Sequence, residues 1–283
     1  MKPKGSFYIW PRLLLLISLI TSLSCGQNIL SEFAKDDTDA ALFKAARIHI
    51  NSSEWDDAIS KFSSMSAAYL AKREVAVVYA SAYAGRCGLD LLALAESMAG
   101  TLPSLLFKFL MAQYKNVTTA NRDDCKTAET IIKAISADAA LRTVDENLLM
   151  AFLSFAKIGA TISAHADKAD FDGNPDGGWN ACTDDAANFP EASVREVGTG
   201  LALALISLGA VGGQSTIGSG QLTSLTDLCN DLSGINPALD FCSITEAATY
   251  DANQVKGIRS IVQANEWVGI GSCNNTLDNC LCP

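Results

Sequence analysis

The chain has 283 residues, of which 49% are hydrophobic and 7% aromatic, and its formal net charge is −10 at pH 7. This acidic balance argues against a protein that binds nucleic acid or anionic lipid by charge. The length suffices for one large domain or two modest ones with a real hydrophobic core. Because alanine, leucine and serine dominate and β-branched runs are rare, the composition predicts an all-α fold.

The stretch 1–24 has the three parts of a secretory signal peptide. Basic residues come first, an apolar run covers 13–23, and small residues lead to Cys25. Such a run is too short to span a bilayer stably and is typical of an export signal that is removed. The stretch resembles the signal of a bacterial lipoprotein. That resemblance implies that Cys25 becomes the N-terminus and is acylated.

Cleavage after Ser24 without acylation is the alternative. The lipoprotein pattern places a leucine three residues before the cysteine, where this chain has Ser22, and Ser22 and Ser24 also fit an ordinary small-x-small cleavage site. The chain has nine cysteines, so eight remain when Cys25 is set aside. An even number of cysteines can pair completely in an oxidising compartment, which favours a lipoprotein signal over simple cleavage after Ser24. We therefore predict an exported protein of the periplasm or outer membrane that contacts the membrane through its N-terminal lipid alone.

Residues 25–39 are polar and acidic and predict a tether, and residues 40–100 predict pairs of helices. The spacing Ala46…Trp55-x-x-Ala58-x-x-x-Phe62 resembles a tetratricopeptide repeat, in which small residues let paired helices approach. A second copy would begin about 34 residues later. This copy departs from the pattern in two places: an aromatic is expected at Glu96 and a small residue at Leu92. Two unrelated α-hairpins are the alternative, since helix pairs with small residues are common in any bundle.

Residues 101–283 predict a helical bundle with an acidic loop at 167–190 and a cysteine-rich tail. We expect helices at 105–114, 125–140, 144–166, 190–208, 222–232 and 245–268, with a polar connection at 116–124. The segment 144–166 is dense in leucine and phenylalanine, which is typical of a buried central helix. The apolar stretch 201–211 is too short to cross a membrane.

The acidic loop contains a candidate calcium site. Asp172, Asn174 and Asp176 alternate before a glycine, which resembles the first half of an EF-hand loop. Oxygens at alternate positions of a tight turn converge on one hard cation. The family pattern has a bidentate glutamate where Thr183 stands. Carboxylates nearby are possible substitutes: Asp167, Asp170, Asp184 and Asp185. We expect a structural Ca²⁺ on Asp170, Asp172, Asn174 and Asp176, with a solvated turn as the alternative.

Eight cysteines follow Cys25 and are disulfide candidates: Cys87, Cys125, Cys182, Cys229, Cys242, Cys273, Cys280 and Cys282. Their number allows too many pairings for the sequence to choose among them. Cys280-x-Cys282 also fits a metal or redox site, but the chain's histidines, His49 and His165, lie far away in the sequence. We therefore predict structural disulfides that stabilise the C-terminal part.

The sequence contains no motif that identifies an enzyme. A glycine-rich phosphate loop, a Gly-x-Ser-x-Gly elbow and a His-Glu-x-x-His motif are all absent. We therefore expect no catalytic activity. The first hypothesis is a binding or scaffolding module of the bacterial cell envelope with a protein or peptide partner. The second is an accessory helical-repeat lipoprotein of a solute uptake system, and the third is a hydrolase whose base and nucleophile the sequence does not reveal.

Overall fold

The computed structural model describes residues 37–98, 105–115, 117–183, 188–212, 219–265, 268–271, 273 and 277–283. The predicted signal peptide at 1–24 and the acylation site Cys25 lie outside these residues, as does nearly all of the tether at 25–39. Within the described part the chain is helical, which confirms the all-α prediction, and its β-structure is limited to one isolated bridge between Ala264 and Cys273.

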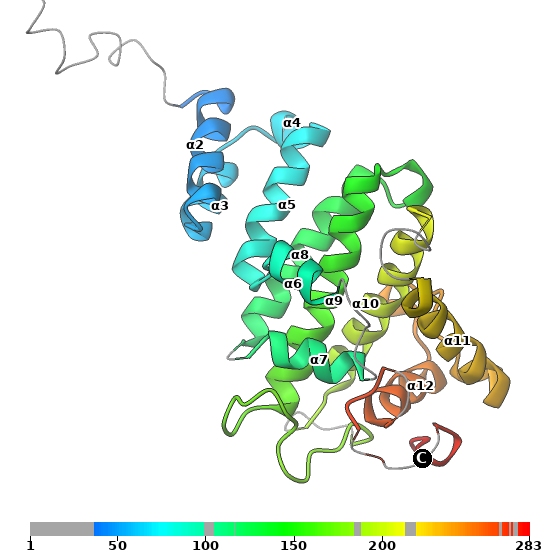
Figure 1. Ribbon diagram of the computed structural model, residues 1–283. Coiled ribbons are helices and arrows are strands. Elements are labelled where there is room, and N and C mark those ends of the chain that lie inside the picture. Colours follow the sequence, from blue (N-terminus) through cyan, green and yellow to red (C-terminus); the bar gives the residue numbers. More distant parts are fainter. Residues whose placement is uncertain are drawn as a thin grey trace, which may run out of the picture.

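The helices follow one another along the chain, with a long loop between α9 and α10 (Figure 1). The α-helices are α2 (Asp39–Asn51), α3 (Trp55–Ser63), α4 (Ala67–Leu70), α5 (Arg73–Cys87), α6 (Leu91–Met98), α7 (Leu106–Gln113), α8 (Thr119–Ile135), α9 (Val144–Ala166), α10 (Glu191–Ala210), α11 (Ser219–Ile235) and α12 (Ala252–Gln263). The 3₁₀ helices are η1 (Ala139–Leu141), η2 (Pro237–Leu239), η3 (Ala247–Thr249) and η4 (Leu277–Asn279).

Helix α9 is the centre of the molecule, as the sequence predicts for residues 144–166. It packs against α5, α7, α8 and α10, and most of its residues are buried. A capping box at Thr143 and Glu146 begins the helix. A Cβ added at Gly159 would lie 2.7 Å from the carbonyl oxygen of Leu110, so this glycine allows α7 to approach closely.

Helices α9 and α10 are long and apolar enough to cross a membrane by length and composition. Within the protein, however, 83% of the apolar window of α9 and 72% of that of α10 is buried. A core helix often has this composition, so the pattern is weak evidence for a membrane span.

The α2–α3 hairpin forms a small core of its own with α5. Phe62 is fully buried there and stacks on Tyr79, with 4.7 Å between the ring centroids. The next helices do not repeat this arrangement, because α5 packs mainly against α8 and makes few contacts with α6. Leu92 of α6 is 69% exposed. The tetratricopeptide-like repeat is therefore not confirmed.

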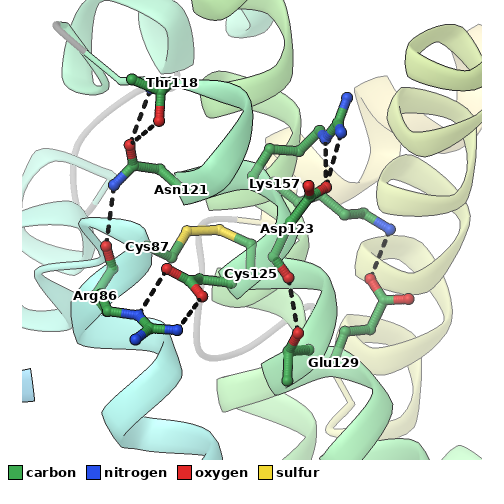
Figure 2. The surroundings of a disulfide bond; sticks show 11 residues. Arg86, Cys87, Thr118, Asn121, Asp123, Cys125, Glu129 and Lys157 are labelled. Atoms are coloured by element: carbon green, nitrogen blue, oxygen red, sulfur yellow. Dashed lines mark hydrogen bonds and ion pairs between the residues drawn. A yellow bond between two sulfur atoms is a disulfide. The ribbon is translucent and has the colours of Figure 1, made fainter. Parts of the chain in front are cut away.

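Strong contacts at the end of α5 explain why it pairs with α8 (Figure 2). Cys87 and Cys125 join the two helices at disulfide distance. Beside them the Arg86 guanidinium donates to both carboxylate oxygens of Asp124, at 2.9 and 2.7 Å. Asn121 donates through Nδ2 to the carbonyl oxygen of Arg86, at 3.1 Å. These partners are distant in the sequence, so helical periodicity gives no sign of them.

The predicted bounds of two helices are wrong, and the first of these helices also ends early, at Ile135 rather than at 140. Helix α8 begins at Thr119, within the stretch predicted as a connection, because Thr118 and Asn121 form a capping box there. The helix predicted over 245–268 is broken, since η3 ends at Thr249 and the side chain of Asp251 caps a new helix, α12.

Candidate functional site

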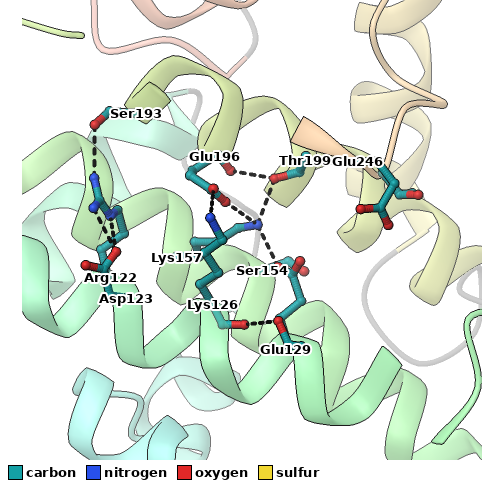
Figure 3. Close-up of polar contacts among 12 residues, drawn as sticks. Arg122, Asp123, Lys126, Glu129, Ser154, Lys157, Ser193, Glu196, Thr199 and Glu246 are labelled. Carbon is teal, nitrogen blue, oxygen red and sulfur yellow. Dashed lines mark hydrogen bonds and ion pairs between the residues drawn. The ribbon is translucent and has the colours of Figure 1, made fainter. Parts of the chain in front are cut away.

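Helices α8, α9 and α10 bring a buried cluster of charges together (Figure 3). Lys157 of α9 is 0% exposed, and its Nζ lies 2.6 Å from Glu129 Oε2 on α8 and 3.3 Å from Glu196 Oε2 on α10. The same ammonium donates to Thr199 Oγ1 at 2.8 Å. Lys157 Nζ thus donates hydrogen bonds to Glu196 and Thr199 and forms an ion pair with Glu129.

Two further lysines complete the cluster at its rim. Lys126 Nζ lies 2.6 Å from Glu196 Oε1, and Lys133 Nζ lies 3.3 Å from Glu129 Oε1. Each buried glutamate thus contacts one lysine inside the protein and one at its surface. The surface beside Glu196 is hollowed by about 340 Å³, and the lining residues are Lys126, Ala192, Arg195, Glu196, Ala247 and Ala248.

Burial and the charges of the cluster shift the pKa values of Glu196 and of the neighbouring Tyr250. Burial works to raise the pKa of Glu196, but Lys157 and Lys126 outweigh burial and hold this pKa below its ordinary value. Burial and the charges of Glu196 and Glu129 raise the pKa of the Tyr250 hydroxyl, which donates to the carbonyl oxygen of Ile244 at 2.7 Å. The glutamate is therefore ionised and the tyrosine neutral at pH 7. Lys157 is buried and has three polar partners, two of which are carboxylates.

A second polar contact joins His165, at the end of α9, to Ser193, at the start of α10. His165 Nε2 lies 2.8 Å from Ser193 Oγ, which also accepts a hydrogen bond from Arg122 Nη1 at 3.0 Å. The histidine–serine distance is one that a hydrolase uses for its base and nucleophile. Ser193 is only 1% exposed, however, and it lines neither of the hollows described for this protein. A substrate does not reach this serine in the observed conformation.

Sequence analysis missed the His165–Ser193 pair because the two residues are 28 positions apart. The available signal was the order of the helices. When two consecutive helices pack antiparallel, the last turn of the first lies beside the first turn of the second. His165 lies in the last turn of α9 and Ser193 in the first turn of α10.

His165 predicts an acid sensitivity of the fold. Burial, and then the charges of Lys168 and Arg122, lower its pKa from 6.5 to about 4, against a hydrogen bond with the backbone of Asn188. The unfolded chain therefore binds the proton first, so stability is complete above pH 6.5 and declines as the pH falls towards 4. A shift of this size corresponds to a loss of roughly 3 kcal/mol of unfolding free energy.

Urea unfolding at several pH values measures this loss. His165→Gln should reduce the decline between pH 6.5 and 4, whereas His49→Gln, at the chain's other histidine, should leave it as in the unmodified protein. An unchanged decline in His165→Gln would assign the acid sensitivity to other groups.

The structure divides the predicted calcium ligands into two groups. Asp170 and Asp176 come together with Asp167, with one ligand oxygen of each within 4.8 Å of the others. Asp172 and Asn174 instead line a hollow of about 400 Å³ against α7, and Asp172 Oδ1 accepts a hydrogen bond from the Asn174 backbone at 2.7 Å.

Two carboxylates of the loop also hold its backbone. Asp176 accepts hydrogen bonds from the N–H groups of Lys168 and Ala169, and the buried Asp167 accepts from those of Asp172 and Gly173. Replacing Asp167 or Asp176 would therefore loosen the loop with or without an ion. Asp170, which is exposed, offers a cleaner test of ion binding.

Calcium binding to this loop remains a prediction, and thermal unfolding tests it. If the ion binds the native state, calcium at about 100 times its dissociation constant adds about 2.7 kcal/mol to the free energy of unfolding. The melting temperature should rise with millimolar calcium, rise less with magnesium, and respond much less in Asp170→Asn. A melting temperature that ignores calcium in the unmodified protein would identify the loop as a solvated turn.

The eight cysteines after Cys25 lie at disulfide distance in four pairs. The pairs are Cys87–Cys125, Cys182–Cys282, Cys229–Cys242 and Cys273–Cys280. Cys280 and Cys282 thus have different partners.

Comparison of the chain with protein-family models, with curated proteins and with solved structures finds no match.

Proposed function

We propose that this protein is an exported binding or scaffolding module of the bacterial cell envelope, held at the membrane by a lipid on Cys25. The observation that supports export is the pairing of every cysteine that follows Cys25. Disulfides form and persist in oxidising compartments outside the cytosol. Cys25 is the one cysteine left over, which is the role that an acylated N-terminal residue would have.

A role in binding rather than catalysis rests on the state of the polar groups. The buried ammonium of Lys157 is occupied by three partners, and Ser193 is 1% exposed. Neither of the two clusters therefore offers a reactive group to a substrate. A partner in the envelope, protein or peptide, would instead contact an outer face of the helices.

The alternative function is an accessory subunit of a solute uptake system. That function would need a deep apolar channel among the helices. The two hollows described here, of about 400 and 340 Å³, are open to solvent and carry charged residues on their linings. This shape favours recognition of a macromolecular surface over enclosure of a small solute.

The α2–α3 hairpin is the face that we assign to the partner, because Ile48 on α2 is 56% exposed. A photo-crosslinking amino acid at position 48 should give a discrete adduct of higher mass in living cells. The same amino acid at Ile235, which is 39% exposed on α11, is the matched control. A position-48 variant that folds and reaches the envelope but yields no adduct would contradict binding through this face.

A further inference from the structure

One end of the helical bundle exposes three large apolar side chains. Leu141, Val144 and Ile206 are 68%, 58% and 38% exposed, respectively. They lie in η1, at the start of α9 and near the end of α10. Arg142 Nη1 approaches Ser207 Oγ at 3.5 Å, which places η1 against the last turns of α10. We call these three residues the apolar end.

The described chain begins at this same end of the molecule. Asp39, at the start of α2, accepts hydrogen bonds from the backbone N–H and hydroxyl of Ser66, at 2.8 and 2.6 Å. Helix α4 follows Ser66 and leads to Arg73, whose Nη2 donates to the carbonyl oxygen of Leu141 at 3.0 Å. Arg73 also forms an ion pair with Glu146 in the first turn of α9.

These contacts connect the start of α2 to the apolar end over a short distance. The residues from Ser66 to Arg73 span at most about 25 Å even when fully extended. Figure 1 shows the start of α2, helix α4 and the start of α5 at one end of the molecule. Helix α6 follows the opposite end of α5, which is about 22 Å away along a 15-residue helix.

The chain between Cys25 and Asp37 sets the reach of a lipid anchor. Twelve residues span at most about 40 Å. A lipid on Cys25 therefore holds the start of α2 within about 40 Å of the bilayer surface. The most exposed apolar group of the described residues at that end is Leu141.

We infer that the apolar end docks on the surface of the bilayer that holds the lipid, an assignment that rests on the proposed acylation of Cys25. Exposed leucine, isoleucine and valine side chains gain free energy by entering the boundary between headgroups and acyl chains. Asp138 and Asp145 are exposed beside these side chains, and the whole chain is acidic, so the surface suits lipids without net charge and is repelled by anionic ones. Docking fixes the orientation of the protein and directs the α5–α6 turn away from the membrane.

Fluorescence quenching by brominated lipid tests this inference. The acylated protein carrying Leu141→Trp is purified from membranes and reconstituted in phosphatidylcholine vesicles, with and without bromine on the acyl chains. The matched variant is Leu92→Trp on α6, where the native leucine is equally exposed, at 69% against 68%. The emission that Leu141→Trp adds should be lost in brominated vesicles, whereas the emission that Leu92→Trp adds should be kept. Anionic phosphatidylglycerol in the vesicles should reduce the quenching.

The outcomes separate docking from anchoring. If neither variant shows quenching of its added tryptophan when bound to vesicles, docking is overturned and the proposed anchor is unaffected. Quenching of both overturns a defined docking surface. If the added tryptophan of Leu141→Trp is shielded from solvent without vesicles and the mass in solution is doubled, the apolar end is covered by a second copy of the chain. This result also overturns membrane docking.

A second tether makes the test independent of acylation. The chain starting at residue 25, with an N-terminal hexahistidine, is captured on vesicles that contain a nickel-chelating lipid. Selective quenching of Leu141→Trp on these vesicles supports docking through the apolar end, even if the protein from cells carries no lipid. Absence of that lipid would overturn only the proposed acylation of Cys25. Absence of quenching on them overturns docking.

Discussion

Replacing Lys157 by methionine should lower the free energy of unfolding by about 3–5 kcal/mol. The substitution keeps much of the side-chain volume but removes the positive charge that lies 2.6 Å from Glu129 and 3.3 Å from Glu196. Both carboxylates then lose their buried partner and keep only a rim lysine. The cost of an uncompensated buried charge exceeds the net contribution of the intact ion pairs, because desolvation of the ions offsets most of their attraction. Urea unfolding at pH 7 measures the difference.

Lys44→Met on the exposed face of α2 is the matched control and should change stability little, since surface substitutions usually stay within about 0.5 kcal/mol. Adding Glu129→Gln to Lys157→Met should recover part of the loss by removing one unpaired charge. A loss below about 1 kcal/mol in Lys157→Met would mean that water reaches the cluster and that it is not the buried network described here.

Removing the Cys182–Cys282 pair should destabilise the fold about as much. These cysteines are 100 residues apart, and closing a loop of that length lowers the entropy of the unfolded chain by an amount worth about 4.7 kcal/mol. The pair also ties the acidic loop to the C-terminal tail. The double variant Cys182→Ala/Cys282→Ala should therefore unfold at a much lower urea concentration than the unmodified protein.

The matched control is Cys229→Ala/Cys242→Ala, which opens a loop with a sequence separation of 13. Its loss should be smaller, about 3 kcal/mol, because loop-closure entropy grows with loop length. If the two double variants were equally stable, or if neither differed from the unmodified protein, the loops closed by these pairs would not be what stabilises the C-terminal part.

The sequence was most informative where one helix carries the signal by itself. Apolar density over residues 144–166 predicts α9 with its observed bounds, because Thr143 and Glu146 provide a local start signal and most residues of the helix are buried. The parity of the cysteines likewise predicts that the eight after Cys25 pair. Their partners follow from tertiary structure alone, as for Cys182, whose partner is 100 residues away.

Prediction failed where partners come from distant parts of the chain. The tetratricopeptide-like spacing predicts a second repeat after α2 and α3, but α5 pairs with α8 through Arg86 and Asp124, and no local pattern records that choice. The partners of Lys157 are similarly 28 and 39 residues away. Periodicity shows only a lysine on an apolar helix.

The acidic loop shows a third kind of limit. Alternation of Asp172, Asn174 and Asp176 predicts convergence only if the loop adopts the expected turn. Here the buried carboxylate of Asp167 binds the backbone of Asp172 and Gly173 and bends the loop so that Asp170 and Asp176 approach Asp167. Spacing alone does not distinguish a carboxylate that binds backbone N–H groups from one that is available to an ion.

The intact mass of the protein purified from membranes tests the proposed function most directly. We predict a chain that starts at Cys25, carries the added mass of acyl groups on its first residue, and is eight hydrogens lighter than the reduced form because its four cysteine pairs are oxidised. A chain that still contains residues 1–24, or one without acyl groups whose cysteines are reduced, would contradict an exported, lipid-anchored protein.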